Sequence, residues 1–311
     1  MRLSLSTDSL SAYRTIGLSD LEALRAVKRT GFRVVDYCMT LQNHAQPLRE
    51  GCALRKAFEE TGICANQAHA VGYNPLFPAG QGIENYLKNA LLFCKEARIK
   101  QIVIHPGALD GNSRDEFMEK NAAFYRSLIP YCEETGVGVM IENIGNYADP
   151  YLLRSGEDLM ELVMRVGHPL VTACWDTGHA NHFFHEDCDQ YSSICALGDK
   201  LTAIHFNDNA GYFSDERQHS RIDMHLPPYA SWCGSLNYDA VLKALCDTGY
   251  KGTFNFEVTA FHLRRNVEPF CLNGEVIDRL GLPPLELWVK MYSLIYETGK
   301  YMLEAYGVYE E

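Results

Sequence analysis

No apolar run in this 311-residue chain approaches the ~20 residues that a membrane-spanning helix needs. The first ten residues, MRLSLSTDSL, also lack the continuous apolar core of a signal peptide, because serines alternate with Leu3 and Leu5. Such alternation is typical of a β-strand. We therefore expect a cytoplasmic protein without a membrane partner.

Basic residues are also scarce in this chain. It has 28 lysines and arginines against 40 aspartates and glutamates, and its net charge is −12 with histidine neutral. No run of lysine and arginine occurs, whereas proteins that bind duplexes use such side chains to neutralise phosphates. The charge balance therefore argues against a nucleic-acid partner.

The eleven cysteines form no C-x-x-C pair, and their number is odd. Scattered cysteines in a chain of this length are not typical of a secreted domain that disulfides hold together. We expect reduced thiols, which agrees with a cytoplasmic location.

Short β-rich runs alternate with longer helical patterns along the chain, which is typical of a parallel sheet built from βα units. The eight expected strands cover residues 3–8, 34–38, 64–69, 101–106, 138–143, 171–176, 201–206 and 253–258. The expected helices between them cover residues 18–30, 47–61, 83–98, 114–135, 156–166 and 238–248. A glycine follows five of these helices and is the usual residue just past a helix end.

Eight βα units without a break in composition predict a single (β/α)8 barrel, a TIM barrel of the α/β class, over residues 1–311. A doubly wound open sheet is the alternative, but no glycine-rich phosphate turn follows the first strand. The stretch 259–284 is long for a barrel loop and is predicted to form a lid. A helix over residues 285–306 would then close the ring.

The stretch 171–181, VTACWDTGHAN, places an acid at the end of an apolar strand and a histidine in the following turn. Asp176 alone would be typical of a helix N-cap, because its carboxylate can accept backbone N–H groups. With His179 it could instead belong to a metal site at the mouth of a barrel. The ends of the other strands decide between these interpretations.

Six consecutive strands end in a residue type that can bind a metal: His69, His105, Glu142, Asp176, His205 and Glu257. Successive side chains of a strand face opposite ways, so Glu257 lies opposite the bulky Phe256 and points into the barrel. Burying three histidines and three carboxylates at one point without a cation would be costly. The pattern therefore predicts a metal site at the carboxyl ends of the strands, where barrel enzymes keep their active sites.

Four stretches carry a resemblance to a known family: DTGHAN (176–181), KLTAIHFNDNAG (200–211), IDMHLPP (222–228) and SLNYDAVLKALCDTGYKGTFNFEV (235–258). They resemble the xylose isomerase-like barrel superfamily, in particular its sugar-phosphate isomerase/epimerase branch, and the likeness runs from about Leu3 to Val258. The resemblance implies a metal-dependent isomerase or epimerase that acts on a small ketose or sugar phosphate by proton transfer through an enediolate.

In those relatives four residues hold one divalent ion, and they match Glu142, Asp176, His205 and Glu257. The resemblance further implies that Glu142 and Glu257 are the catalytic pair that removes and returns the proton. Three carboxylates and one imidazole suit Mn2+, Zn2+, Co2+ or Mg2+.

The same superfamily contains endonuclease IV, a DNA-repair phosphodiesterase with three zinc ions, so two or three ions stay open. Its ligand set has further counterparts here, which are additional metal-binding or substrate-binding candidates: His69, His105, His179, Asp223 and His225. Against this alternative, LPPYAS follows the D-x-H element that Asp223 and His225 form, as in the sugar branch. A cyclitol dehydratase is a third alternative, and the sequence is also compatible with a homo-oligomer.

Overall fold

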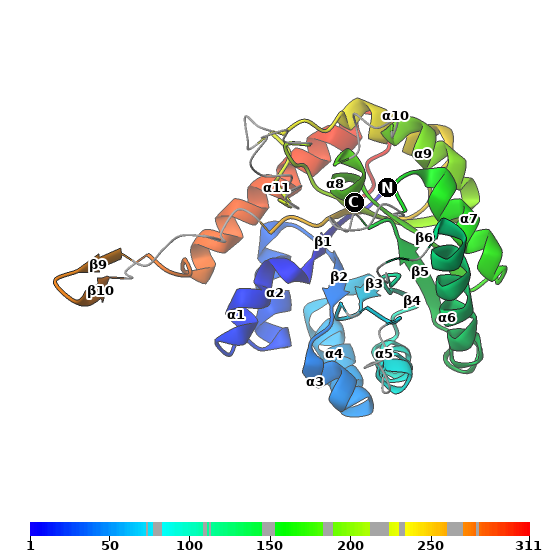
Figure 1. The fold of residues 1–311 in the computed structure, drawn as a ribbon. Coiled ribbons are helices and arrows are strands. Elements are labelled where there is room, and N and C mark those ends of the chain that lie inside the picture. The colour runs from blue at the N-terminus through cyan, green and yellow to red at the C-terminus, as the bar shows by residue number, and fades with distance from the viewer. Residues whose placement is uncertain are drawn as a thin grey trace.

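Eight parallel strands form a closed barrel in the order β1 to β8, with β8 pairing back onto β1 (Figure 1). The computed structural model describes residues 1–72, 74–76, 83–107, 111, 113–144, 153–182, 189–211, 224–229, 234–259, 270–277 and 280–311. The barrel strands are β1 Leu3–Ser6, β2 Val34–Cys38, β3 Cys64–His69, β4 Gln101–Val103, β5 Gly138–Glu142, β6 Val171–Asp176, β7 Leu201–Phe206 and β8 Phe254–Phe256. The predicted (β/α)8 barrel is thus confirmed, and the open sheet is wrong.

Helices surround the barrel (Figure 1). They are α1 Ser11–Thr15, α2 Asp20–Thr30, α3 Leu41–Ala45, α4 Pro47–Thr61, α5 Ile83–Ala97, α6 Arg114–Thr135, α7 Gly156–Val166, α8 Thr177–Asn181, α9 Gln190–Leu197, α10 Tyr238–Asp247 and α11 Leu285–Ala305, with 3-10 turns η1 Thr7–Leu10 and η3 Gly198–Lys200. The longer helices agree with the prediction, whereas α1, α3, α8 and α9 were not predicted. Among the helices that the structure describes, none is both long and apolar enough to cross a membrane.

Sequence signals at the helix ends explain where these helices start and stop. Ser19 and Glu22 form a capping box at the start of α2, each side chain accepting from the other's backbone N–H. Gly31 ends the same helix with φ of 111°, and a Cβ built there would lie 2.6 Å from the ring of Tyr296. Glycine therefore permits both the turn and the close packing of α11 against α2.

The barrel interior below the strand ends is divided into two halves of different polarity. Strands β4 to β7 contribute a small apolar cluster: Val103, Met140, Cys174 and Ala203. Strands β8, β1, β2 and β3 contribute fully buried polar side chains: Asn255, Ser4, Asp36 and Gln67. The apolar half shows that carbon side chains can fill this interior, so the polar half needs a separate explanation.

Helix α11 closes the ring at the seam between β8 and β1. The Trp288 indole N–H donates to the Ser9 carbonyl at 3.0 Å, and the Tyr292 hydroxyl donates to the Val258 carbonyl at 2.7 Å. Both aromatic side chains are fully buried and stacked on each other. These contacts hold the last helix over the segments that follow β1 and β8.

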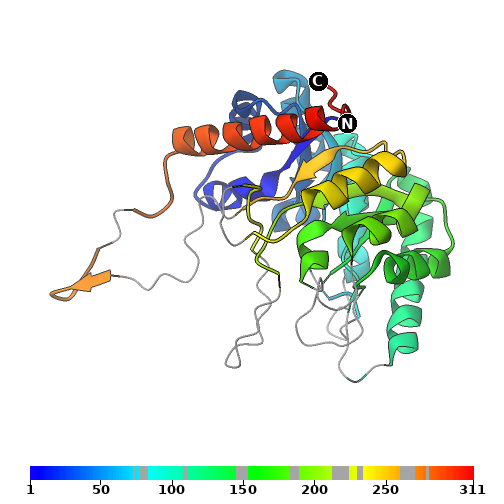
Figure 2. The ribbon, with the colours of Figure 1, turned by 90° about the horizontal axis from the view of Figure 1, so that it is seen from above.

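An exposed hairpin, β9 Phe270–Leu272 and β10 Glu275–Ile277, stands away from the barrel beyond the start of α11 (Figure 2). Its turn residues Asn273 and Gly274 have φ of 52° and 82°, as two-residue hairpin turns require. Residues 260–269 and 278–279 of the predicted lid lie outside the described part of the chain. The lid over 259–284 therefore stays a prediction.

Candidate metal centre and active site

Four acidic and imidazole side chains converge at the carboxyl ends of β5 to β8. Glu142, Asp176, His205 and Glu257 each offer one ligand atom, and these atoms all lie within 4.8 Å of one another. All four residues are buried, Glu257 the least with 8% exposure. The four predicted metal ligands are therefore brought to one point.

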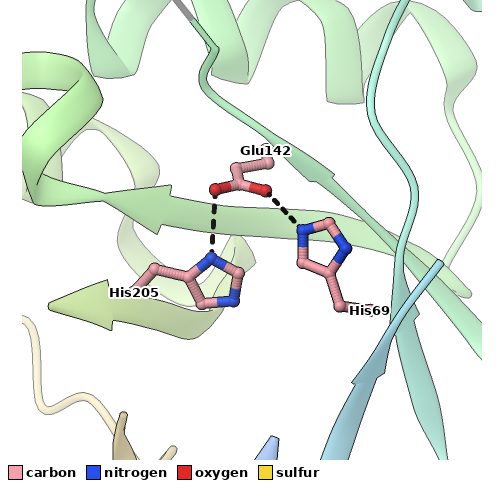
Figure 3. Close-up of side chains that lie close together, drawn as sticks. All are labelled: His69, Glu142 and His205. Atoms are coloured by element: carbon pink, nitrogen blue, oxygen red, sulfur yellow. Dashed lines mark hydrogen bonds and ion pairs between the residues drawn. The ribbon is translucent and has the colours of Figure 1, made fainter. Parts of the chain in front are cut away.

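The two carboxylate oxygens of Glu142 face different histidines, as Figure 3 shows for His205 and His69. Its Oε1 lies 3.0 Å from Nδ1 of His205, and its Oε2 lies 3.3 Å from Nε2 of His69. Nε2 of His105 lies 2.8 Å from the same Oε2. Glu257, which lies just beyond β8, also approaches His205, with its Oε2 2.8 Å from Nδ1. Nδ1 of His205 thus faces both glutamates.

Asp176 serves as a helix cap and as a member of this cluster. Its Oδ1 accepts the backbone N–H of His179 at 2.7 Å, which starts α8. Its Oδ2 accepts from the amide of Asn207 at 2.8 Å, and its backbone N–H donates to Oδ1 of Asn143 at 2.6 Å. The two interpretations of the DTGH stretch are therefore compatible, because the cap holds the carboxylate at the mouth.

Three further histidines at the mouth share one arrangement: Nδ1 lies within 3 Å of a backbone carbonyl. The pairs are His69 with Ala70, His179 with Asn143 and His225 with Glu257. A carbonyl can only accept, so each neutral ring carries its proton on Nδ1 and its lone pair on Nε2. This arrangement prepares Nε2 to bind a cation or to accept from a substrate hydroxyl.

His105 departs from the predicted position, because β4 ends at Val103 and His105 lies in the following loop. The side chain still reaches Glu142. Asp223, the remaining candidate, lies outside the described residues, whereas His225 is described with an unusual positive φ of 43°. A non-glycine residue in this conformation is uncommon and often marks a functional site.

The family model of the xylose isomerase-like TIM barrel matches residues 24–273. The chain belongs to this family. The match confirms the predicted superfamily. A relative from Sinorhizobium fredii (strain NBRC 101917 / NGR234), the uncharacterized protein y4fM, is 24% identical over 180 residues. That alignment covers 57% of this chain and 52% of the relative, so the chain matches about half of the relative's length.

Solved structures show the same fold over most of this xylose isomerase-like chain. A D-psicose 3-epimerase in the presence of D-fructose has a TM-score of 0.69 at 14% identity, covering 97% of this chain and 99% of its own. A D-tagatose 3-epimerase-like protein has a TM-score of 0.67 at 18% identity, with 96% and 100% coverage. The IolI protein with a bound zinc atom has a TM-score of 0.63 at 20% identity, with 83% and 89% coverage.

The charges of this xylose isomerase-like site are unequally distributed among its carboxylates. Burial raises the pKa of Glu257, but the His205 imidazole outweighs it and lowers the pKa to about 2. Burial likewise opposes a low pKa for Glu142, yet His205 and His105 hold it well below its usual range. Burial raises the pKa of Asp176 to about 7, to which the charges of Glu257 and Glu142 add.

The donor set fits a divalent cation. The carboxylates of Glu142, Asp176 and Glu257 and the imidazole of His205 supply three oxygens and one nitrogen, a mixture that suits Mn2+, Zn2+, Co2+ or Mg2+. Three buried carboxylates around a single imidazole also carry an excess of negative charge. A cation at this point would offset the cost of burying them.

Sequence reasoning missed four polar residues that support this cluster: Asp36, Gln67, Asn143 and Asn207. Asn143 and Asn207 lie just beyond strands β5 and β7 and hold Asp176 in place. A signal for Asp36 was present, because it interrupts the apolar strand VVDYC at a position of inward parity. A search for charged residues at the inward positions of every strand would have found Asp36.

Proposed function

We propose that this chain is a metal-dependent sugar isomerase or epimerase that acts on a small ketose or sugar phosphate by proton transfer. The observation that carries the proposal is the placement of Glu142, at the end of β5, and Glu257, just beyond β8, within 3.0 Å of the same His205 nitrogen. Two carboxylates at one cation site can remove a proton from a carbon and return one to it. The shared fold with sugar 3-epimerases supports this assignment.

Each part of the cluster has a role in the proposed reaction. Glu142, Asp176, His205 and Glu257 would hold the cation, which when bound supplies stabilisation of the negative charge that develops on the substrate oxygens. One of the two glutamates takes the proton from the carbon next to the carbonyl. The other returns a proton, and the face from which it does so decides whether the carbon is epimerised.

The histidines at the mouth would orient the substrate. His179 follows Asp176 in the same turn, and its Nδ1 is engaged by the Asn143 carbonyl at 2.8 Å. Nε2 would therefore hold the substrate oxygen at the reacting carbon. His225 is fixed in the same way by the Glu257 carbonyl, and its ring centroid lies 6.3 Å from that of His179.

A multi-zinc phosphodiesterase is the second candidate, and one observation favours it. Nε2 of His69 and Nε2 of His105 lie 3.1 Å apart, and both face Oε2 of Glu142. These three groups could hold a second ion that Glu142 would bridge to the first. Anomalous scattering at the zinc and manganese edges would count the ions, and we expect one.

The test of function starts from protein purified without chelator. We expect elemental analysis to find a divalent ion, and we expect turnover of at least one ketose or ketose phosphate that a chelator abolishes and Mn2+, Co2+, Mg2+ or Zn2+ restores. Cleavage of abasic-site DNA without turnover of any sugar would contradict the proposal and favour the phosphodiesterase.

The quaternary structure and location also stay predictions. The described hairpin exposes Phe270, Leu272 and Val276 by 51% to 61%, and an isolated two-stranded hairpin is marginally stable in water. This exposure supports a homo-oligomer in which a second copy covers the hairpin. Analytical ultracentrifugation of the full chain, compared with the F270S variant, would test it. The cytoplasmic location and the lack of a nucleic-acid partner rest on the sequence alone.

A further inference from the structure

Asp36 of β2 faces the candidate ligand His205 from below the metal centre. Both side chains are fully buried. Oδ2 of Asp36 lies 3.1 Å from Nε2 of His205, while Nδ1 on the other side of the same ring faces Glu142 and Glu257. The imidazole is therefore held between the cation site and a carboxylate outside it.

The surroundings of Asp36 do not explain its burial. Its Oδ2 accepts from the amide of Asn255 at 3.3 Å, and its Oδ1 has no hydrogen-bond partner among the residues that the structure describes. A buried carboxylate that is only partly satisfied costs free energy. The apolar half of the same interior shows that the fold does not need a carboxylate in this layer. The contact with His205 is therefore the interaction that accounts for a buried carboxylate at Asp36.

We propose that Asp36 is a positioning residue, which holds His205 with its proton on Nε2 so that the lone pair of Nδ1 is presented to the cation between Glu142 and Glu257. The inference rests on the proposed metal-dependent function. An imidazole nitrogen binds a metal only without its proton, so the remaining proton must lie on the other nitrogen. A carboxylate that accepts this proton fixes the tautomer and the ring orientation and makes the ligand more basic.

Gln67 competes for the same nitrogen. Its amide nitrogen lies 2.9 Å from Nε2 of His205, and its Oε1 accepts from Asn66 at 3.0 Å. If Gln67 donated to Nε2, the ring proton would move to Nδ1 and block ligation there. Asp36 favours the opposite tautomer, and a charge-assisted hydrogen bond is roughly twice as strong as a neutral one. With Asp36 dominant, the Gln67 amide would turn its oxygen towards the same proton.

The test compares wild type with Asp36→Asn, Asp36→Leu and the control Ser4→Ala. Ser4 lies in the same polar half and donates to Asn66 at 3.1 Å, but the variant keeps the carboxylate at His205. We expect the Kd for Zn2+, measured by competition with a chelator, to rise about tenfold in Asp36→Asn and towards about 100-fold in Asp36→Leu. Ser4→Ala should leave this Kd unchanged.

Two further readouts separate positioning from a structural role. Long-range proton–nitrogen NMR of the zinc-loaded wild type should place the His205 proton on Nε2, and a proton on Nδ1 would overturn the proposal. Asp36→Asn should lower the stability of the metal-free protein towards urea, because it removes one partner of a buried pair with His205. A loss of that stability with an unchanged Kd would show that Asp36 is structural only.

The proposed function can fail separately. If wild type binds no divalent ion, the metal-dependent reaction is wrong. The NMR spectrum of the metal-free protein then still decides whether Nε2 of His205 donates to Asp36. Absence of a proton on Nε2 in that spectrum would overturn the positioning role as well.

Discussion

Lowering the pH should weaken divalent-ion binding at this site. Asp176 can bind a cation only as a carboxylate, and burial raises its pKa to about 7. A group with this pKa is about nine-tenths ionised at pH 8 and about one-tenth ionised at pH 6, so Asp176 alone should reduce the affinity about tenfold between the two. His205 should add to the loss. Burial lowers its pKa, but Cys174, Glu257 and Glu142 outweigh this and raise it well above the usual value.

The assay measures both the affinity and the protons released. Chelator competition at several pH values gives the affinity for Zn2+ or Mn2+, and calorimetry in buffers of different ionisation enthalpy counts the protons that binding displaces. Glu257→Gln provides a comparison, because the charge of Glu257 helps to raise the pKa of Asp176. This variant should bind more weakly, and the midpoint of its pH dependence should move lower. An affinity that stays constant from pH 6 to 8, without proton release, would refute the reasoning.

Two other predictions concern stability. Gly178→Ala should destabilise the protein by about 1–3 kcal/mol in urea unfolding and weaken metal binding, because the new Cβ would lie 1.9 Å from Oδ1 of Asn207, whose amide holds Asp176. The control is Gly72→Ala, whose new Cβ would have no atom within 4 Å. Equal stabilities of the two variants would contradict the prediction. Removing the ion with a chelator should lower the Tm more at pH 8 than at pH 6. Because the pKa of Asp176 is raised, this group contributes stability to the metal-free protein that is fully present below about pH 4 and is lost as the pH rises through about 7. A bound ion therefore offsets more repulsion at high pH. A smaller loss of Tm at pH 8 than at pH 6 would contradict this.

The barrel could be predicted from the sequence because local signals agree along the whole chain. Because successive side chains alternate along a strand, the outward Phe256 predicts that Glu257 points into the barrel. Glycines such as Gly31, just after α2, mark the helix ends. The short helix α8 could not be predicted separately, since it depends on the Asp176 cap. The hairpin was missed although its Asn273-Gly274 turn is a strong local signal, because the long segment suggested a lid.

The four-residue cluster could also be predicted, because equivalent strand ends meet at one mouth. The contacts beyond it could not. Which nitrogen of His205 faces Glu142 depends on the side-chain rotation and on Asp36, which lies far away in the sequence. The position of His225 depends on a loop with positive φ, and no period in the sequence reports such a conformation.

Deuterium incorporation tests the central claim most directly. The protein, loaded with a divalent ion, is incubated in D2O with ketoses and ketose phosphates, and the products are examined by NMR. Proton transfer through Glu142 and Glu257 predicts deuterium at the epimerised or isomerised carbon. It also predicts that Glu257→Gln lowers the rate of deuterium exchange by far more than roughly 100-fold, which is the lower end of what general acid–base catalysis contributes. Product without solvent deuterium, or a Glu257→Gln rate within about tenfold of wild type, would contradict the account.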